Sequence, residues 1–515
     1  MSLNWGAFGV FLILFALVTA LGFAAARWRR GDLDLLHEWG LGGRRFGTFM
    51  SWFLMGGDFF TASAMIALPA LVYGAGATGA FGTTYSVFIF PLIFIFAPRL
   101  WSVCRNRGYL TAADFVRGRH GNRALATAVA VTGIVATMPY IALQLVGIQV
   151  VLAAMGLETT GIAGDLPLIV AFIILAGFTY KSGLRAPASI AVVKDLLLYI
   201  TGIAAIVAIP IALGGISGIF KAIPADKLVL APPGPGTLGS YSTYVTLGIG
   251  SALGWGLYPH SVTGLLSANS RSAIQRNAVL LPLYTLVISG MALMGYMAAS
   301  AGLAQMPQFA PMFKQFGSTF AVPALFLHFF PAWFAGLAFA GLAIGALVPS
   351  GIMSIAAANL FSRNIYREFF RPDCTPREET QAAKWMSLLV KFGALLIILV
   401  LPNQYMVNFQ LIGSIAIVQT LPSVFIALYT RWFNAWALLA GWIAGIAAGL
   451  AMLVSVGFKA PFYSLVMGGF TIPAYIAIYA LGVNLVVAAA ITLAVKLMRS
   501  PAAADDETAV LDYVS

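Results

Sequence analysis

The sequence predicts an all-α polytopic membrane protein with about thirteen transmembrane helices. Three observations lead to this prediction. First, 60% of the 515 residues are hydrophobic and only 9% are charged, whereas a soluble chain carries roughly 25% charged residues because its surface faces water. Second, apolar runs of about 20 residues, the length that crosses a bilayer, recur along the chain. Third, Lys and Arg cluster in alternate loops between these runs.

Each predicted span is an apolar run long enough to cross a hydrocarbon core of roughly 30 Å. The ninth run is too long for one straight crossing. The stretch His328-Phe329-Phe330-Pro331 indicates a short lead-in helix before the true span, which starts near Ala332. The thirteen runs lie near residues 5–27, 47–73, 80–100, 124–155, 165–181, 187–212, 241–266, 278–303, 323–362, 385–402, 405–429, 433–456 and 467–496.

The basic residues predict the orientation of the chain. Starting with the loop after the first span, alternate loops hold nearly all of the 29 Lys and Arg residues, and such residues concentrate in cytoplasmic loops. The amino terminus is therefore predicted outside and the carboxyl terminus inside. The net charge of +12 is then a topology signal, and no nucleic-acid partner is expected. The exceptions to the alternation are Lys194, Lys221, Lys227, Lys314, Lys391 and Lys459.

The chain is expected to form one membrane domain with a cytoplasmic tail. Its tail from Pro501 is short and polar, so we expect it to be disordered. Residues 109–123 are expected to form a short amphipathic cytoplasmic helix. The predicted segments are 1–46 (first span and cytoplasmic loop), 47–212 (spans 2–6), 213–240 (an irregular Pro/Gly-rich outside loop), 241–429 (spans 7–11), 430–497 (spans 12–13) and 498–515 (tail).

Several functional classes lack their sequence signals. The two cysteines, Cys104 and Cys374, have no C-x-x-C partner, so neither a disulfide framework nor a cysteine metal site is indicated. The four histidines are scattered, and no HExxH, GxSxG or Walker A motif is present. Neither an enzyme nor an ATP-driven pump is therefore expected, and no organic cofactor is predicted.

Two predicted spans are interrupted at corresponding places. Span 2 contains Gly56-Gly57-Asp58 and then Pro69, and span 7 contains Gly254-Trp255-Gly256 and then Pro259. In lipid, interrupted helices survive only where they line a protein cavity, and paired interruptions in two halves of a chain mark a transporter's binding site. Spans 2–6 and 7–11 would then form two repeats of five spans, inverted because five is odd. This pattern favours a carrier over a channel.

At these residues the chain resembles the sodium:solute symporter family, which has a LeuT-type 5+5 inverted-repeat fold with discontinuous first helices in each repeat. The resemblance covers roughly residues 5–430. Within the family, the chain looks most like the bacterial monocarboxylate permeases, which carry lactate, pyruvate, acetate or propionate, and in some cases alanine. The matching stretches are Met55-Gly56-Gly57-Asp58-Phe59-Phe60-Thr61, Trp255-Gly256-Leu257-Tyr258-Pro259-His260, Tyr109-Leu110-Thr111-Ala112-Ala113-Asp114-Phe115 and Asn364-Ile365-Tyr366.

The resemblance implies a cation site between span 2 and span 9. Backbone carbonyls of Gly56, Phe59 and Ala346 would match ligands of a Na⁺ ion, and Ser350 would match one of two adjacent hydroxyl ligands. Pro349 replaces the other hydroxyl and offers no side-chain oxygen. The implied Na⁺ site is therefore one ligand short.

Three ionisable residues in the spans are candidates for cation coupling. Asp58 lies near mid-membrane, where an ionised carboxylate is costly; it would partner a coupling cation or cap the broken helix. Asp195 in span 6 matches an acidic residue of the family, whereas Lys194 replaces a neutral one. In some proton-coupled relatives of the fold, a lysine in this helix reaches the place of sodium, and burial can make a lysine a proton carrier. The alternative is a fixed ion pair of Lys194 with Asp195 or Asp58. The coupling ion is thus H⁺ or Na⁺.

The substrate is expected between spans 2, 4 and 7, where broken-helix N-termini direct N–H groups at a small organic anion. No span interior contains an arginine. Tyr140 and Gln144 lie four residues apart on one helical face, and each aromatic candidate could instead serve ordinary packing. The substrate-binding candidates are Gly56, Gly57, Thr61, Ser63, Tyr140, Gln144, Trp255, Tyr258 and His260.

The predicted function is cation-coupled import of small monocarboxylates by alternating access, in the inner membrane of a bacterium. Two alternatives remain open: Na⁺-coupled symport of another small organic solute, such as an amino acid, a pantothenate-like compound or a sugar, and an uncoupled, channel-like facilitator.

Overall fold

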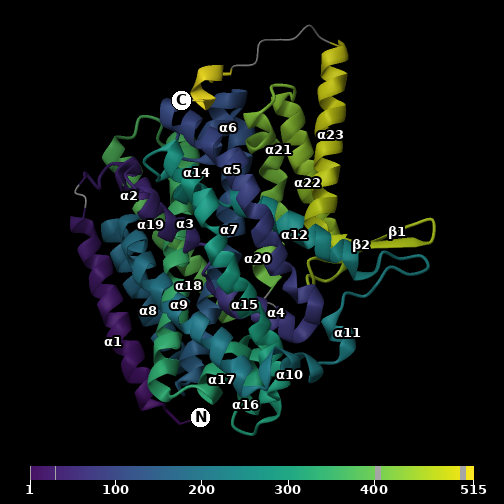
Figure 1. Ribbon diagram of the computed structural model, residues 1–515. Helices are drawn as coiled ribbons and strands as arrows, with labels where there is room; N and C mark the ends of the chain where they lie inside the picture. Colours follow the sequence, from purple (N-terminus) through teal and green to yellow (C-terminus); the bar gives the residue numbers. More distant parts are fainter. Residues whose placement is uncertain (1, 29–30, 160, 401–407, 499–505, 515) are drawn as a thin grey trace.

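The computed structural model describes residues 2–28, 31–159, 161–400, 408–498 and 506–514. Helices run nearly parallel through one bundle, with the amino terminus at one end and the carboxyl terminus at the other (Figure 1). In the described part of the chain the only sheet is one antiparallel hairpin of two strands. The prediction of an all-α polytopic architecture is confirmed.

Eleven helices of the described residues are long and apolar enough to cross a membrane. This count joins α4 to α5 (Phe81–Arg107) and omits α12 and α13. Span 2 is not counted separately because its second half is merged with span 3, and span 7 is not counted because α12, although 19 residues long, is not apolar enough and α13 has only 8 residues. Counting both gives the thirteen crossings that the sequence predicts.

Span 2 is broken in mid-course. Helix α3 (Thr48–Gly56) ends before a non-helical stretch at residues 57–61, and a π-helical turn (Ser63–Ala67) leads into α4 (Leu68–Ala75). Gly56 and Gly57 favour this break because glycine loses more conformational freedom in a helix than any other residue. The predicted interruption in span 2 is confirmed.

Span 7 is broken by a different mechanism. Helix α12 (Gly239–Leu257) stops at Tyr258, whose backbone is extended (φ −60°, ψ 136°), and α13 (Pro259–Leu266) follows at once. A proline disfavours the α conformation of the residue before it, so Pro259 enforces the break. Helix α13 packs against α3, so the two broken spans meet.

The unbroken spans surround these two. Helix α18 is central and packs against α1, α7, α9 and α19. A lead-in helix, α17 (Ala321–Phe329), precedes α18 as predicted, with Pro331 between them. The spans are α1 (Trp5–Ala24), α7 (Arg123–Ala154), α8 (Gly161–Ser182), α9 (Arg185–Ala212), α14 (Arg271–Leu280) with α15 (Pro282–Ser300), α18 (Ala332–Phe361), α19 (Pro376–Val400), α20 (Phe409–Ile417) with α21 (Leu421–Val424), α22 (Ala435–Ser455) and α23 (Ile476–Met498).

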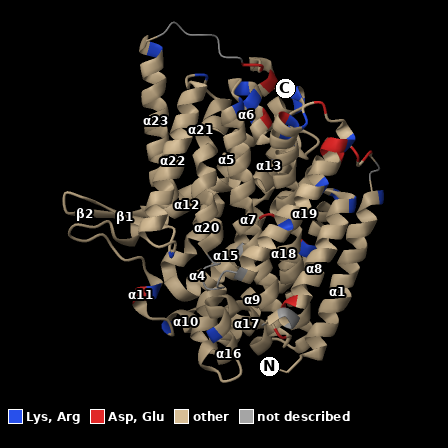
Figure 2. Cartoon of the chain, turned by 180° about the vertical axis from the view of Figure 1, so that it is seen from behind, with Lys and Arg blue, Asp and Glu red and all other residues tan. Residues whose placement is uncertain are grey.

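Short helices cap the two ends of the bundle. Helices α2 (Leu36–Leu41) and α6 (Ala112–His120) lie toward the end that carries the carboxyl terminus, and α10 (Gly215–Lys221), α11 (Ala225–Leu228) and α16 (Ala310–Phe316) lie toward the opposite end (Figure 1). The loop at 213–240 is therefore not wholly irregular, since it holds α10 and α11. Lys and Arg gather toward the carboxyl-terminal end (Figure 2).

Two further expectations are wrong. The thirteenth span begins at Ile476 rather than 467, because residues 462–475 form the hairpin of β1 (Phe462–Met467) and β2 (Phe470–Tyr475). Its turn, Gly468-Gly469, has φ of 57° and 81°, a backbone that glycine adopts readily. The tail is not disordered in residues 506–514, where Tyr513 is buried; residues 499–505 lie outside the described part.

Candidate substrate and cation site

Asp58 joins the two broken helices. Its carboxylate is buried, one oxygen accepts a 2.8 Å hydrogen bond from the Ser261 hydroxyl, and the other lies 3.2 Å from His260 Nε2. Both partners belong to the first turn of α13, where unpaired backbone N–H groups and the positive end of the helix dipole favour an anion. The predicted residues Asp58 and His260 are therefore brought together, and Ser261, which the sequence analysis missed, completes the contact.

Lys194 fills the break in span 2. Its ammonium donates hydrogen bonds to the carbonyl oxygens of Gly57 (2.6 Å) and Phe60 (3.1 Å) and lies 3.0 Å from the carboxylate of Asp195. Lys194 and Asp195 are both fully buried. Of the two ion pairs left open by the sequence, the structure forms Lys194–Asp195. Helix α9 thus places the amino group of Lys194 among the carbonyls of the broken helix.

Tyr284 on α15 completes this buried charge cluster. Its hydroxyl donates a 2.6 Å hydrogen bond to the second carboxylate oxygen of Asp195. Its ring lies against Gly56 so closely that a Cβ on Gly56 would be 2.0 Å from the ring. Gly56 must therefore be glycine for steric reasons. Nothing in the sequence marks Tyr284, because one tyrosine of an apolar run differs from the others only in what it meets.

The oxygens that the family resemblance assigns to Na⁺ already accept hydrogen bonds. The Gly56 carbonyl accepts from Phe59 N, and the Phe59 carbonyl accepts from Thr61 N. The Ser350 hydroxyl donates to the Ala346 carbonyl within α18 (2.8 Å).

Na⁺ requires a shell of several free oxygens, and here the neighbouring carbonyls are held by the Lys194 ammonium. The Lys194 ammonium thus lies beside the implied sodium site, whose shell is one oxygen short because Pro349 offers no hydroxyl.

Several buried donors near the breaks have no hydrogen-bond partner among the described residues. Gln144 accepts a bond from Ala62 N through Oε1 (2.8 Å), which leaves its amide Nε2 unpaired. The indole nitrogen of Trp255, the hydroxyl of Ser251 and Nδ1 of His260 are unpaired as well. Buried polar groups are nearly always hydrogen-bonded. These unpaired donors are available for hydrogen bonds with a polar ligand or with ordered water. Ser251 lies one helical turn before Trp255, which could have indicated it.

Aromatic side chains wall the same region. Trp255 stacks on Phe59 with ring centres 5.0 Å apart, and Tyr140 lies 5.4 Å from both Tyr258 and His260. The hydroxyl of Tyr258 donates to the Gln410 carbonyl of span 11 (3.1 Å). Tyr258 thus ties span 7 to span 11, and its role as a substrate contact stays a prediction.

Thr61 and Gly57 also lie in the break. Thr61 is buried, and its hydroxyl oxygen accepts from Ala64 N (3.4 Å), which helps to start the second half-helix of span 2. A Cβ on Gly57 would lie 2.9 Å from the Lys194 ammonium, so Gly57 allows the lysine to approach. The side chain of Ser63 lies outside the described part, and its predicted role stays a prediction.

Two small cavities flank the breaks. One, of about 30 Å³, lies between spans 2, 3, 7 and 11 and is lined by Tyr85, Ser251 and Gln410. The other, of about 20 Å³, lies on the opposite side of the span 7 break and is lined by Pro259 and Thr263. Each has room for one or two water molecules.

Known proteins resemble the chain over nearly its whole length. A model of the sodium:solute symporter family matches residues 39–445. A protein of Rhizobium johnstonii named monocarboxylate transport permease protein is 47% identical over 492 residues, covering 95% of this chain and 96% of that protein. The uncharacterized symporter YodF of Bacillus subtilis is 30% identical over 445 residues, covering 86% of this chain and 87% of that protein.

A solved structure shares the fold. It shows a Na⁺-coupled sialic acid symporter in a substrate-bound outward-open state, with a TM-score of 0.75 and 17% identity, over 97% of this chain and 99% of that chain. The predicted LeuT-type architecture is thereby confirmed. In this chain the interrupted first helices of the two repeats are spans 2 and 7, which meet at Asp58.

Proposed function

Because the chain belongs to the sodium:solute symporter family, we propose that it is a proton-coupled importer of small monocarboxylates such as lactate, pyruvate, acetate and propionate, with alanine as a further substrate. Family membership makes it a multi-pass, cation-coupled transporter rather than an enzyme. The monocarboxylate substrate, the proton and the orientation with the amino terminus outside a bacterial inner membrane are proposed.

The observation that carries the substrate proposal is the set of unpaired neutral donors at the breaks. A carboxylate accepts several hydrogen bonds through its two oxygens, and the Gln144 amide, the Trp255 indole and the Ser251 hydroxyl supply N–H and O–H groups without a partner. Leaving a buried donor unpaired costs about 1–3 kcal/mol, and a bound carboxylate recovers this free energy.

The observation that supports proton coupling is the position of Lys194. Its ammonium holds the carbonyls of Gly57 and Phe60 and so supplies one positive charge to the unwound backbone of span 2. When Lys194 loses its proton, the positive charge that ties α9 to this backbone is lost. The buried carboxylate of Asp195 then loses its ionic partner and keeps only the hydrogen bond from Tyr284. Protonation of Lys194 is therefore linked to the arrangement of the broken helix, as binding of a cation would be.

The name of the similar protein from Rhizobium johnstonii supports the same substrate class. The match covers 95% of this chain, so the similarity includes both broken helices and α9.

Transport by the purified protein in liposomes tests the proposal. Uptake of labelled pyruvate is measured with an inward pH gradient in Na⁺-free buffer, and separately with an inward Na⁺ gradient at equal pH and no membrane potential. We expect accumulation only with the pH gradient. Accumulation driven by Na⁺ alone would overturn proton coupling. If none of a panel of short carboxylates and alanine is transported or shows counterflow, the substrate assignment is overturned. If a substrate crosses the membrane but shows no counterflow, the protein is a channel-like facilitator.

A further inference from the structure

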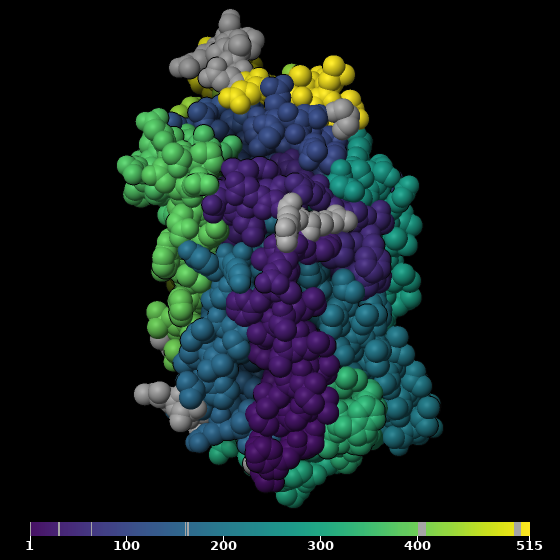
Figure 3. Space-filling model, turned by 90° about the vertical axis from the view of Figure 1, so that its left-hand side faces the viewer, coloured from purple at the N-terminus to yellow at the C-terminus, as the bar shows by residue number. Residues whose placement is uncertain are grey.

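The C-terminal segment, residues 506–514, packs on the end of the bundle that carries the basic loops. It lies against the region of α5 and α6, as the space-filling view shows (Figure 3). Glu507 N donates to the Gly118 carbonyl (2.8 Å), Arg431 donates to the Thr508 carbonyl (2.9 Å), and Asn106 donates to the Asp512 carbonyl (3.1 Å). The segment therefore touches the end of span 3, α6 and the end of span 11 together.

A buried charge pair anchors the start of the segment. The guanidinium of Arg119 on α6 is 4% exposed and donates to the Asp506 carboxylate, which also lies 3.1 Å from Arg431. Arg119 also donates to the carbonyls of Ala427 and Thr430 at the end of span 11, each at 3.0 Å. Asp506 is the only carboxylate paired with Arg119 in the described part of the chain. Undocking the segment would leave this buried charge without its counter-ion, which is costly.

An aromatic anchor holds the other end of the segment. Tyr513 is 4% exposed and meets the ring of Phe115 on α6 edge-on. The guanidinium groups of Arg99 and Arg119 lie 5.6 and 5.9 Å from its ring centre, within the range of cation–π attraction. Asp512 adds an ion pair of 2.7 Å with Arg107 at the end of α5. An exposed polar tail would show neither a buried tyrosine nor buried ion pairs.

Helix α6, which the segment grips, lies between the substrate region and the carboxyl-terminal end of the bundle (Figure 1). Thr111 and Ala112, at the start of α6, line the small cavity beneath the span 7 break together with Pro259, Thr263 and Ala356. Any route from the breaks to this end through that cavity requires α6 to move.

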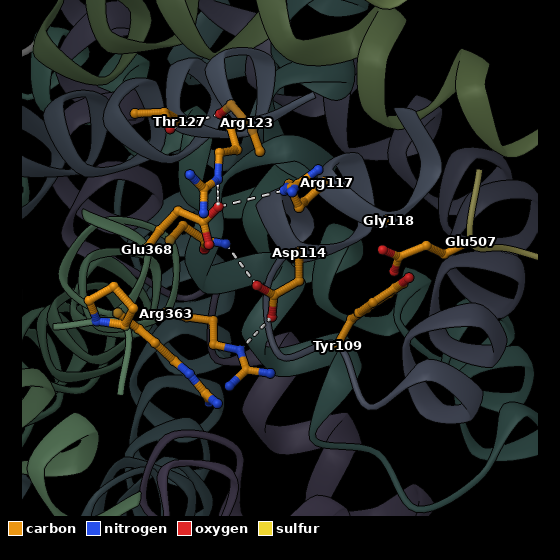
Figure 4. Close-up of a pocket in the computed structure, with 13 residues that line it drawn as sticks. Tyr109, Asp114, Arg117, Gly118, Arg123, Thr127, Arg363, Glu368 and Glu507 are labelled. Carbon is orange, nitrogen blue, oxygen red and sulfur yellow. Dashed lines mark hydrogen bonds and ion pairs between the residues drawn. The ribbon is translucent and has the colours of Figure 1, made fainter. Parts of the chain in front are cut away.

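The opposite face of α6 is held by the end of span 9, a π-helical segment (Ser362–Phe370). Figure 4 shows Arg117 and Arg123 on Glu368, and Arg363 beside Asp114, around an open cavity of about 350 Å³. These pairs are partly exposed, and such ion pairs contribute little. Buried hydrogen bonds from Thr111 to Asn364 (2.8 Å) and from Asn364 to Asp114 (2.7 Å) also join α6 to the end of span 9. The buried Arg119–Asp506 pair and Tyr513 add a second hold on α6 from the C-terminal segment.

We propose that residues 506–514 are an intramolecular latch, which fastens α6 to the ends of spans 3 and 11 and thereby keeps the cytoplasmic side of the carrier closed. Release of this C-terminal latch favours the inward-open state and speeds release of substrate to the cytoplasm. The inference rests on the alternating-access carrier and the proposed orientation, but not on the identity of the substrate or the coupling ion.

Cysteine labelling tests the latch independently of transport. Ala356→Cys, in the cavity beneath the span 7 break, and Leu71→Cys, in the cavity on the other side of the breaks, are made separately in a chain with Cys104→Ala and Cys374→Ser. Each is labelled by a small maleimide in purified full-length protein. We compare the intact chain with a deletion of residues 506–515 and with Asp506→Asn.

The deletion is expected to raise the labelling rate of Ala356→Cys about tenfold, the change in an equilibrium constant that corresponds to 1.4 kcal/mol, and to lower that of Leu71→Cys. Asp506→Asn is expected to act in the same direction. Val510→Ser is the matched control, because Val510 belongs to the segment but is 71% exposed. A synthetic peptide with the sequence of residues 506–515, added to the deleted protein, is expected to restore slow labelling.

Unchanged labelling of Ala356→Cys after the deletion would overturn the proposal. A rise at both cysteines would also overturn it, because the segment would then only stabilise the fold. Failure of the monocarboxylate assignment leaves these labelling results unaffected, so the two proposals fail separately.

Discussion

Replacement of Lys194 by methionine tests the buried charge cluster most directly. Methionine keeps much of the length of the side chain but removes its charge. Asp195 is fully buried, and after the replacement its carboxylate keeps only the hydrogen bond from Tyr284. The carbonyls of Gly57 and Phe60 lose the ammonium that binds them.

The expected cost of Lys194→Met follows from this geometry. Removing one partner of a buried ion pair costs about 3–5 kcal/mol, because the other charge is left buried and uncompensated. Lys194→Met with Asp195→Asn removes both charges, and Tyr284 can still donate to the amide oxygen. We therefore expect the double variant to recover roughly half of the lost stability, a coupling energy of about 2 kcal/mol, without recovering proton-driven uptake.

The assay combines reversible unfolding in detergent with uptake in liposomes. The stabilities of the two single variants, the double variant and the parent chain form a thermodynamic cycle. Additive effects of the two substitutions would refute the reasoning, because they would mean that Lys194 and Asp195 do not interact. Proton-driven accumulation by the double variant would show that Lys194 does not carry the coupling.

Gly56→Ala should abolish uptake, because its Cβ would lie 2.0 Å from the Tyr284 ring. Gly74→Ala, in the second half of the same span and with open space around it, should leave pyruvate uptake unchanged. Equal uptake by both variants would contradict the packing. Gln144→Leu should raise the KM for pyruvate about tenfold or more by removing one hydrogen bond to a charged ligand, and an unchanged KM would exclude the amide as a contact. Burial lowers the pKa of His120 to about 4 from 6.5, so between these pH values the unfolded chain binds a proton that the folded chain does not. The free energy of unfolding should therefore fall by about 3 kcal/mol as pH drops from 6.5 to 4. His120→Gln should flatten this fall, and a pH dependence of stability that the substitution leaves unchanged would refute the shift.

The sequence predicts the spans because each depends on a local property. An apolar run of about 20 residues is stable as a helix in lipid wherever its neighbours lie. The two breaks are also local, since Gly56-Gly57 and Pro259 weaken a helix through their own backbones. The hairpin at 462–475 was missed because its strands are as apolar as a span, and only its Gly468-Gly469 turn distinguishes it.

The charged residues of the site could be named but not paired. Asp58 and Asp195 were both possible partners for Lys194, and the structure pairs Lys194 with Asp195, its neighbour on α9 (3.0 Å). Asp58 instead meets His260 and Ser261 on α13. The same limit explains the missing residues: Tyr284 matters because of the glycine and the carboxylate that it touches, and the acid–aromatic pattern of residues 506–514 resembles that of any polar tail.

The sequence by itself determined how often the chain crosses the membrane, where two of those crossings break and that a charge lies buried beside the breaks. It could do so because composition, helix-breaking residues and the cost of charge in lipid each act within one segment. Only the tertiary structure decided which carbonyls Lys194 holds, which donors stay unpaired for a ligand and which surface the C-terminal segment grips. Every residue carries a carbonyl and an N–H group, so the function of these groups arises from which helices meet, and that meeting is a property of the packed bundle.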